Sequence, residues 1–301
     1  MEHQLHTLFT TKTTLSPSSS LLYSKKLTQW LQSTPTTTLA AAPSQPPRQL
    51  LSVLTSNSTI KQTPTNRHIY ISAIVAYIQH IADDKTTLAE WRTIQKENWA
   101  PRTQHYSTSQ PTSQQSDKVI SPEQITSTID SLGYGTLPRL LLSVYSKVEP
   151  VRADYFATEI ITDTDTNARQ PIEDNFISLS STTDTSTITI RDFKTKKRYT
   201  TLTIPIPPHL ADEIRHSLTI LPRRYLFTSP DSPHRPFTRK TFSNWATRTL
   251  TAALKQPMTL TALRHIYISS LDFNAPIQTL ETTSNRMGHS IEMQRRYAWA
   301  I

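Results

Sequence analysis

Three residues near the end of the chain have side chains that can act together on a phosphate group. Arg264 lies in an otherwise apolar segment, His289 follows Gly288, and Tyr297 comes eight residues after His289. The planar arginine fork donates two hydrogen bonds to a phosphate, and a tyrosine hydroxyl can attack phosphorus to form a covalent intermediate. The sequence shows no compact cluster of Asp and Glu of the kind that holds two catalytic metal ions. These residues therefore predict phosphodiester cleavage in which side chains supply the positive charge.

Each of these residues also has a purely structural interpretation. Tyr297 is one of eleven tyrosines and could pack a terminal helix, and both Arg264 and His289 could be structural. The neighbours of Tyr297, from Gln294 to Trp299, are polar and cationic. The sequence Gly288-His289-Ser290 upstream of it favours a nucleophile over a packing residue.

The order and spacing of these motifs resemble the catalytic end of the tyrosine recombinase, or phage integrase-like, family. Leu263-Arg264-His265 is similar to the box around the family's second arginine, and Gly288-His289-Ser290 with Tyr297 is similar to its last motifs. The resemblance covers residues 120–301 with specific motifs, whereas residues 15–100 match only as a helical domain of suitable size. It implies that His289 binds a phosphate oxygen and that Tyr297 attacks DNA to form a 3′-phosphotyrosine.

The same resemblance implies an earlier arginine. Arg152 follows an expected apolar helix and precedes the first expected strand, where the family has its first catalytic arginine. Its segment, Pro150-Val151-Arg152-Ala153-Asp154-Tyr155, most resembles the variant found in integrases of eukaryotic large DNA viruses, virophages and related mobile elements. The alternative is a surface ion pair between Arg152 and Asp154.

The family also has a lysine on a β-hairpin between the two arginines. Lys194, in a charged turn between two alternating segments, matches it best and would protonate the leaving 5′-oxygen. Lys196 and Lys197 compete for this role, and the whole turn could instead be a solvated basic loop that touches backbone phosphate. Contacts to DNA are expected from Lys196, Lys197, Arg198, Arg239 and Lys240.

Two features depart from the family pattern. Many members have a histidine three residues before the second arginine, and this position is Thr261 here. A threonine hydroxyl can still hydrogen-bond a phosphate oxygen, so Thr261 is a candidate for that role. Only four residues follow Tyr297, which predicts that a C-terminal contact with a neighbouring protomer is short, different or missing.

Composition limits the partners and the compartment. The 301 residues carry a net charge of +9, which favours a polyanionic partner, although ordinary solubility charge is the alternative. The absence of cysteine excludes disulfides, thiol nucleophiles and cysteine metal sites. No apolar run is long enough for a membrane span, and residues 1–14 lack a signal-peptide core. We therefore expect an intracellular protein, in the host nucleus or viral replication compartment if the source is a eukaryotic virus, and otherwise in the cytoplasm.

Hydrophobic periodicity predicts two domains. Residues 1–18 read as a disordered or loose N-terminus, 19–102 as a helical DNA-binding domain, 103–119 as a polar linker, and 120–301 as the catalytic domain. The second domain begins at a cap-and-proline helix start, Ser121-Pro122. Its expected strands are 155–161, 175–180, 186–193 and 199–204, and its expected helices are 137–145, 209–219, 239–255, 259–272, 276–286 and 290–298.

These features together predict a mainly α protein with a small antiparallel β-sheet, an α+β fold. The resemblance implies a site-specific recombinase or integrase of a viral or mobile element that needs no metal, ATP or other cofactor. Its partners would be double-stranded DNA and three further copies in a homotetramer on two DNA sites, with no membrane and no small-molecule substrate. The alternatives are a monomeric type IB topoisomerase-like enzyme, a catalytically decayed DNA-binding relative, and a chance match of motifs.

Overall fold

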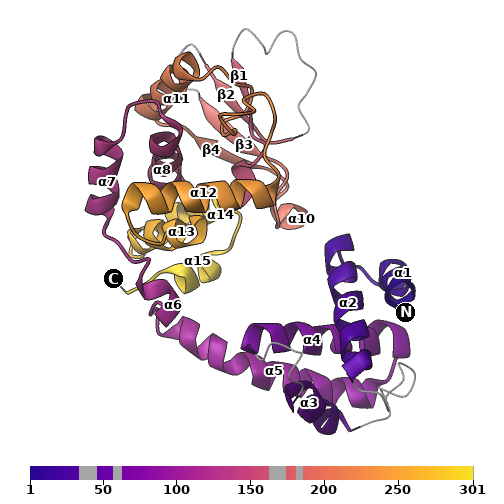
Figure 1. Cartoon of the computed structure of the whole chain (residues 1–301). Coiled ribbons are helices and arrows are strands. Elements are labelled where there is room, and N and C mark those ends of the chain that lie inside the picture. The colour runs from indigo at the N-terminus through magenta and orange to yellow at the C-terminus, as the bar shows by residue number, and fades with distance from the viewer. Residues whose placement is uncertain (34–45, 57–62, 163–173, 181–185, 301) are drawn as a thin grey trace. The chain divides into compact units, whose positions relative to one another are not determined.

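A computed structural model of the chain describes residues 1–33, 46–56, 63–162, 174–180 and 186–300 (Figure 1). The chain divides into two compact units, Met1–Ser107 and Thr108–Ile301. The division falls inside the stretch 103–119, for which we predicted a linker. Helices occupy part of that stretch, because α5 extends to Ser107 and the short helix α6 covers Ser113–Ser116. Thr112 and Gln115 form a capping box at α6, so local polar hydrogen bonds support a helix that has few apolar residues.

The first unit consists of helices packed around one apolar core. Three of them begin with a proline at the first helical position, where its missing N–H costs nothing. Trp30, Ile71 and Trp91 are almost completely buried in this core. The elements are α1 (Glu2–Lys12), α2 (Pro17–Ser33), α3 (Pro47–Ser56), α4 (Pro64–Tyr77), the π-helix η2 (Ile78–Ala82) and α5 (Lys85–Ser107).

The prediction of a disordered or loose segment at residues 1–18 was wrong. Residues 2–12 form α1, which packs against α2. Leu5 and Phe9 are buried, and the Phe9 ring meets Tyr23 of α2 edge-on with centroids 6.2 Å apart. Two apolar residues four positions apart suffice to hold this helix, and so sparse a pattern is hard to tell from a polar tail.

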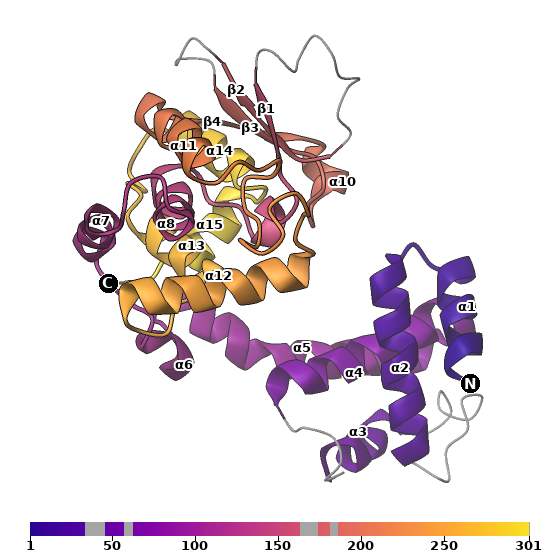
Figure 2. The same ribbon diagram turned by 45° about the horizontal axis from the view of Figure 1, so that its top comes forward.

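The second unit places one buried helix at its centre. α8 (Leu137–Lys147) lies among α7 (Pro122–Ser131), α11 (Pro208–Ile220), α12 (Arg239–Leu254) and α13 (Leu260–Ser269) (Figure 2). α7 begins as predicted, since the Ser121 hydroxyl accepts a hydrogen bond from the Gln124 amide at 3.2 Å. The remaining helices are η3 (Ala153–Tyr155), α10 (Lys196–Tyr199), α14 (Ile277–Arg286) and α15 (Ile291–Tyr297).

A small sheet completes the second unit, with strand order β1-β2-β3-β4. Its strands are β1 (Glu159–Thr162), β2 (Phe176–Leu179), β3 (Thr187–Ile190) and β4 (Leu202–Pro205). β2–β3 and β3–β4 are antiparallel pairs, whereas β1 and β2 are parallel. The predicted α+β fold is confirmed, but the sheet is mixed rather than antiparallel. Alternating side chains reveal which face of a strand is buried and say nothing about the direction of its partner.

None of the helices in the described parts of the chain has the length and apolar character needed to cross a membrane.

Replacing Phe9 with alanine should test whether α1 belongs to the folded first unit. Loss of a fully buried ring is expected to lower the free energy of unfolding of this unit by about 3 kcal/mol. Urea unfolding followed by hydrogen exchange of α2 peptides would measure the change. Thr10→Ala, at an exposed position of the same helix, is the matched control. Equal stability of the two variants would mean that α1 does not contribute to the core.

Candidate active site

Arg264 is buried because the apolar residues around it on α13 pack into the core. Thr259 caps this helix by accepting a hydrogen bond from the Ala262 amide at 3.1 Å. Arg264 is buried, with only 1% of the residue exposed. Its Nη1 donates to the carbonyl oxygen of Pro150. Its Nε and Nη2 have no hydrogen-bond partner in the described part of the chain. Two buried donors on a cation therefore stay available for an anion.

Arg152 is held close to Arg264 by the chain that links α8 to β1. Tyr145 of α8 donates a hydrogen bond from its hydroxyl to the Arg152 carbonyl oxygen at 2.6 Å. Burial, followed by the positive charge of Arg152, lowers the pKa of Arg264 to about 10. The guanidinium of Arg264 therefore keeps its charge at neutral pH and adds to that of Arg152.

The carboxylate that we considered as a partner of Arg152 is engaged elsewhere. Asp154 is buried and pairs with Arg239 of α12, so the alternative of an Arg152–Asp154 ion pair is wrong. None of the ion pairs found among the described residues involves Arg152.

His289 follows a turn that only glycine fits well. Gly288 has a φ of +67°, and a Cβ there would lie 3.2 Å from Thr195 Oγ1 and 3.3 Å from Leu202 Cδ1. Gly288 thus forms a left-handed cap after α14. The turn places the His289 ring in the interior, 4% exposed, where neither ring nitrogen has a partner among the described residues. Burial, with the positive charges of Arg264 and Arg152, lowers the pKa of His289 to about 3. The imidazole is therefore neutral, with one donor and one acceptor to offer.

Tyr297 is the last residue of α15, a helix that Ser290 caps through the Met293 amide. The Tyr297 ring centroid lies 6.0 Å from that of His289. The Arg264 Cζ lies 5.9 Å from the Tyr297 ring centroid. The structure thus brings together four of the residues that we singled out. We call Arg152, Arg264, His289 and Tyr297 the Arg-His-Tyr cluster.

Lys194 lies where predicted, in the exposed connection of the β3–β4 hairpin. The loop is tied to the turn that precedes His289, because Thr195 Oγ1 donates to the Gly288 carbonyl oxygen at 2.8 Å. The hairpin therefore contacts the turn before His289 through the Thr195 side chain, whereas the Lys194 side chain is exposed to solvent. The connection also contains the short helix α10, which the sequence did not reveal.

The other basic residues for which we predicted DNA contacts differ in whether a carboxylate already binds them. Lys196 forms an ion pair with Asp192 at 3.1 Å, whereas Lys197, Arg198 and Lys240 are exposed. Arg239 is bound by Asp154 and by Asp192, at 3.6 Å from the latter, and its guanidinium lies over the Phe156 ring. A DNA phosphate would have to compete with two carboxylates for Arg239, so the four other basic residues are better placed for that contact.

Thr261 is exposed in the first turn of α13. It precedes Arg264 by three residues, and residues at this spacing share one side of a helix. Thr261 is therefore on the same helix as Arg264, but its side chain is exposed whereas Arg264 is buried.

An ion pair between Glu149 and Arg286 was not predicted from the sequence. Arg286 Nη1 donates to Glu149 Oε1 at 2.9 Å, across 137 residues of sequence. Glu149 stands three residues before Arg152, and Arg286 stands three residues before His289. This ion pair joins the two segments that carry the first arginine and the histidine. Opposite charges at matching distances from the two motifs were the only sign of it in the sequence.

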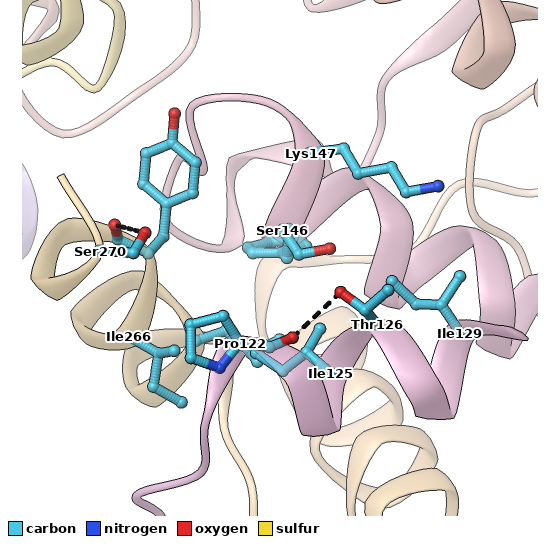
Figure 3. A pocket seen from close by; sticks show the side chains of 11 residues that line it. Pro122, Ile125, Thr126, Ile129, Ser146, Lys147, Ile266 and Ser270 are labelled. Carbon is cyan, nitrogen blue, oxygen red and sulfur yellow. Dashed lines mark hydrogen bonds between the residues drawn. The ribbon is translucent and has the colours of Figure 1, made fainter. Parts of the chain in front are cut away.

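A separate pocket of about 120 Å³ lies among α7, α8 and α13. Figure 3 shows Ile266 and Ser270 on one side of it and Thr126, Ile129 and Lys147 on the other. No member of the Arg-His-Tyr cluster lines this pocket, which is therefore distinct from the candidate site.

Comparison with known proteins gives little beyond this geometry. No protein-family model matches the chain, and no curated protein matches it significantly. Among solved structures, a crystal structure of XerA recombinase is similar with a TM-score of 0.43 and 13% sequence identity, over 100% of this chain and 95% of that chain. The chemistry proposed for the site rests on its own residues.

The neutral state of His289 has a measurable effect on stability. Its pKa is about 3 in the folded protein against an ordinary value of 6.5, so the unfolded chain binds a proton that the folded protein excludes. This contribution to stability is fully present above pH 6.5 and is lost as the pH falls toward 3. Its loss between pH 7.5 and pH 5 should lower the free energy of unfolding by about 2 kcal/mol.

His289→Gln should remove this contribution, so its unfolding free energy should fall less between pH 7.5 and pH 5 than that of the wild type. Urea unfolding of the second unit at both pH values would measure the difference. His216→Gln, at an exposed histidine of the same unit, is the control. Parallel pH profiles for wild type and His289→Gln would contradict a buried, neutral His289.

Proposed function

We propose that this chain is a tyrosine recombinase that cuts and rejoins double-stranded DNA. The observation that carries the proposal is the unpaired hydrogen-bonding capacity buried beside Tyr297. Two donors of Arg264 and both ring nitrogens of His289 lack partners in the described residues, and buried polar groups in folded proteins are nearly always paired. An anion with several oxygen atoms, bound next to a tyrosine hydroxyl, would satisfy them. A phosphodiester is such an anion, and the basic chain suits a DNA backbone.

The residues divide the reaction among them. Arg264 and Arg152 bind the non-bridging oxygens of the scissile phosphate and neutralise the charge that grows as a fifth oxygen approaches phosphorus. His289 and Thr261 hydrogen-bond the same oxygens. Tyr297 gives its phenolic proton to water and forms the new bond to phosphorus, while the bond from phosphorus to the 5′-oxygen breaks.

Lys194 supplies the proton that the departing 5′-oxygen needs. The products are a 3′-phosphotyrosine and a free 5′-hydroxyl, and attack by a 5′-hydroxyl reverses the step. The phosphodiester energy is kept in the covalent link, so rejoining needs no ATP.

On a larger scale we propose that four copies act on two DNA sites and integrate a viral or mobile genome. This assignment follows the resemblance of the Arg152 segment to viral and mobile-element integrases. A nuclear or viral replication compartment would suit that role. A monomer that nicks and closes one duplex could use the same residues, and the oligomeric state on DNA would separate the two.

A second candidate is a DNA-binding protein that has lost catalysis. The observation in its favour is Thr261, which replaces the histidine common in the family and lies exposed. This candidate predicts DNA binding without a covalent product.

Covalent trapping on nicked suicide duplexes should separate the enzyme from the decayed relative. Such substrates lose the 5′-hydroxyl fragment after cleavage, so a protein–DNA adduct should accumulate and survive SDS on a denaturing gel. Tyr297→Phe should abolish the adduct and leave DNA affinity within about twofold, because only the attacking oxygen is lost. Tyr134→Phe, at an exposed tyrosine of the same unit, is the control. Binding without an adduct, for wild type and every substrate tried, would support the decayed relative.

The general acid can be identified with a modified leaving group. Lys194→Ala should slow cleavage of ordinary DNA by about 10²- to 10⁴-fold, the usual contribution of a positioned acid. A sulfur atom in place of the bridging 5′-oxygen leaves without protonation, so cleavage of that substrate by Lys194→Ala should approach the wild-type rate. Lys196→Ala and Lys197→Ala are the matched controls. A variant at either neighbour that shows this rescue, in place of Lys194→Ala, would reassign the role.

A further inference from the structure

The ring of Tyr297 is stacked on a histidine that the proposed chemistry does not use. The His265 and Tyr297 ring centroids lie 4.6 Å apart with an interplanar angle of 17°, and the His265 and Trp299 centroids lie 4.4 Å apart at 5°. One face of an imidazole has room for one stacked ring, so Tyr297 and Trp299 occupy opposite faces. The result is a three-ring stack of Tyr297, His265 and Trp299.

The main chain around Tyr297 is fixed by the same helix. His265 Nδ1 lies 2.6 Å from the Tyr297 carbonyl oxygen, and since a carbonyl only accepts, Nδ1 carries the proton. Ser269 Oγ donates to the His265 carbonyl oxygen and accepts from the Trp299 amide, each at 2.7 Å. One residue after Trp299, the Ala300 amide donates to the Ser109 carbonyl oxygen at 2.7 Å. Residues 297–300 are thus attached at three points to the second unit of their own chain.

These contacts are more than general core packing. His265 directly follows Arg264 on α13. The same helix therefore carries the arginine and the residue that contacts Tyr297. Movement of the Tyr297 ring away from His265 would break the stacking, and movement of its main chain would break the Nδ1 hydrogen bond. Trp299 is 7% exposed and belongs to the core of the second unit, which gives the far side of the stack a rigid support.

We propose that His265 is a positioning residue, which with Trp299 holds Tyr297 beside Arg264 and His289 before DNA is bound. The inference rests on the proposed function, because it names the groups that set the geometry of the nucleophile. In this proposal Tyr297 is positioned by residues of its own chain. A displacement of about 1 Å between reacting groups can cost about 10²-fold in rate, so loss of the stack should act on cleavage rather than on DNA affinity.

The test uses full-length protein and single-turnover cleavage of a nicked suicide duplex. His265→Ala and Trp299→Ala should each lower the cleavage rate by about 10²-fold, with DNA affinity within about twofold of the wild type. His265→Phe keeps a stacking ring without the Nδ1 donor, and His265→Asn keeps a donor without the ring, so each should recover part of the rate. The double variant His265→Ala/Trp299→Ala should be no slower than the slower single variant, because the two rings act as one unit. His216→Ala removes a histidine whose ring contacts that of Tyr134 outside the site, with centroids 5.0 Å apart, and should change neither quantity.

A second measurement does not depend on activity. Hydrogen exchange of the peptide covering residues 291–300 should be faster in His265→Ala and Trp299→Ala than in the wild type and in His216→Ala. Unchanged exchange, an unchanged cleavage rate, or a loss of DNA affinity equal to the loss of rate would each overturn the positioning role. If the exchange responds but wild-type protein forms no adduct on any duplex, the contacts exist and the proposed function is what fails.

Discussion

The burial of the Arg264 guanidinium is the constraint on which the second unit depends. A buried cation is costly unless it is paired, and none of the described carboxylates forms an ion pair with Arg264. Its Nη1 has a main-chain partner, whereas Nε and Nη2 have no hydrogen-bond partner among the described residues. The apolar residues of α13 and α8 pay this cost, because their burial fixes the helix whether or not the arginine is satisfied. The position of this guanidinium is therefore set by apolar packing and by one main-chain hydrogen bond.

The surrounding elements place Arg152, His289 and Tyr297 around Arg264. α8 anchors the Arg152 segment through the Tyr145 hydroxyl. The turn at Gly288 sends His289 inward, and the Glu149–Arg286 ion pair joins those two segments. α15 brings Tyr297 to the same place. Each of these groups comes from a different element, so the geometry of the cluster depends on the packing of the whole second unit.

The sequence predicted local structure and the identity of the cluster better than it predicted pairing in space. The buried helices and the start of α7 followed from periodicity and from the Ser121 cap. Arg264, His289 and Tyr297 were found because they are close in sequence and surrounded by recognisable motifs. The parallel pairing of β1 with β2 was missed, since alternation along a strand is the same for either direction of its neighbour.

The interactions that escaped the sequence join residues far apart in the chain. The Asp154–Arg239 and Glu149–Arg286 pairs span 85 and 137 residues, and the stack of Tyr297 on His265 spans 32. No local pattern distinguishes such partners from solvated charges or isolated rings. They are decided by the tertiary packing that brings the helices together.

Four contacts that shape the site end on main-chain carbonyl oxygens rather than on side chains. The acceptors are those of Pro150, Arg152, Gly288 and Tyr297. A carbonyl oxygen is present whatever residue occupies the position, so these contacts do not depend on the side chain of the acceptor residue, although Arg152, Gly288 and Tyr297 are restricted for other reasons. Pro150 is the acceptor whose side chain has no other role described above, so a different residue there could keep the contact to Arg264. The geometry of a site built in this way can persist through sequence drift that erases most of the similarity by which relatives are recognised.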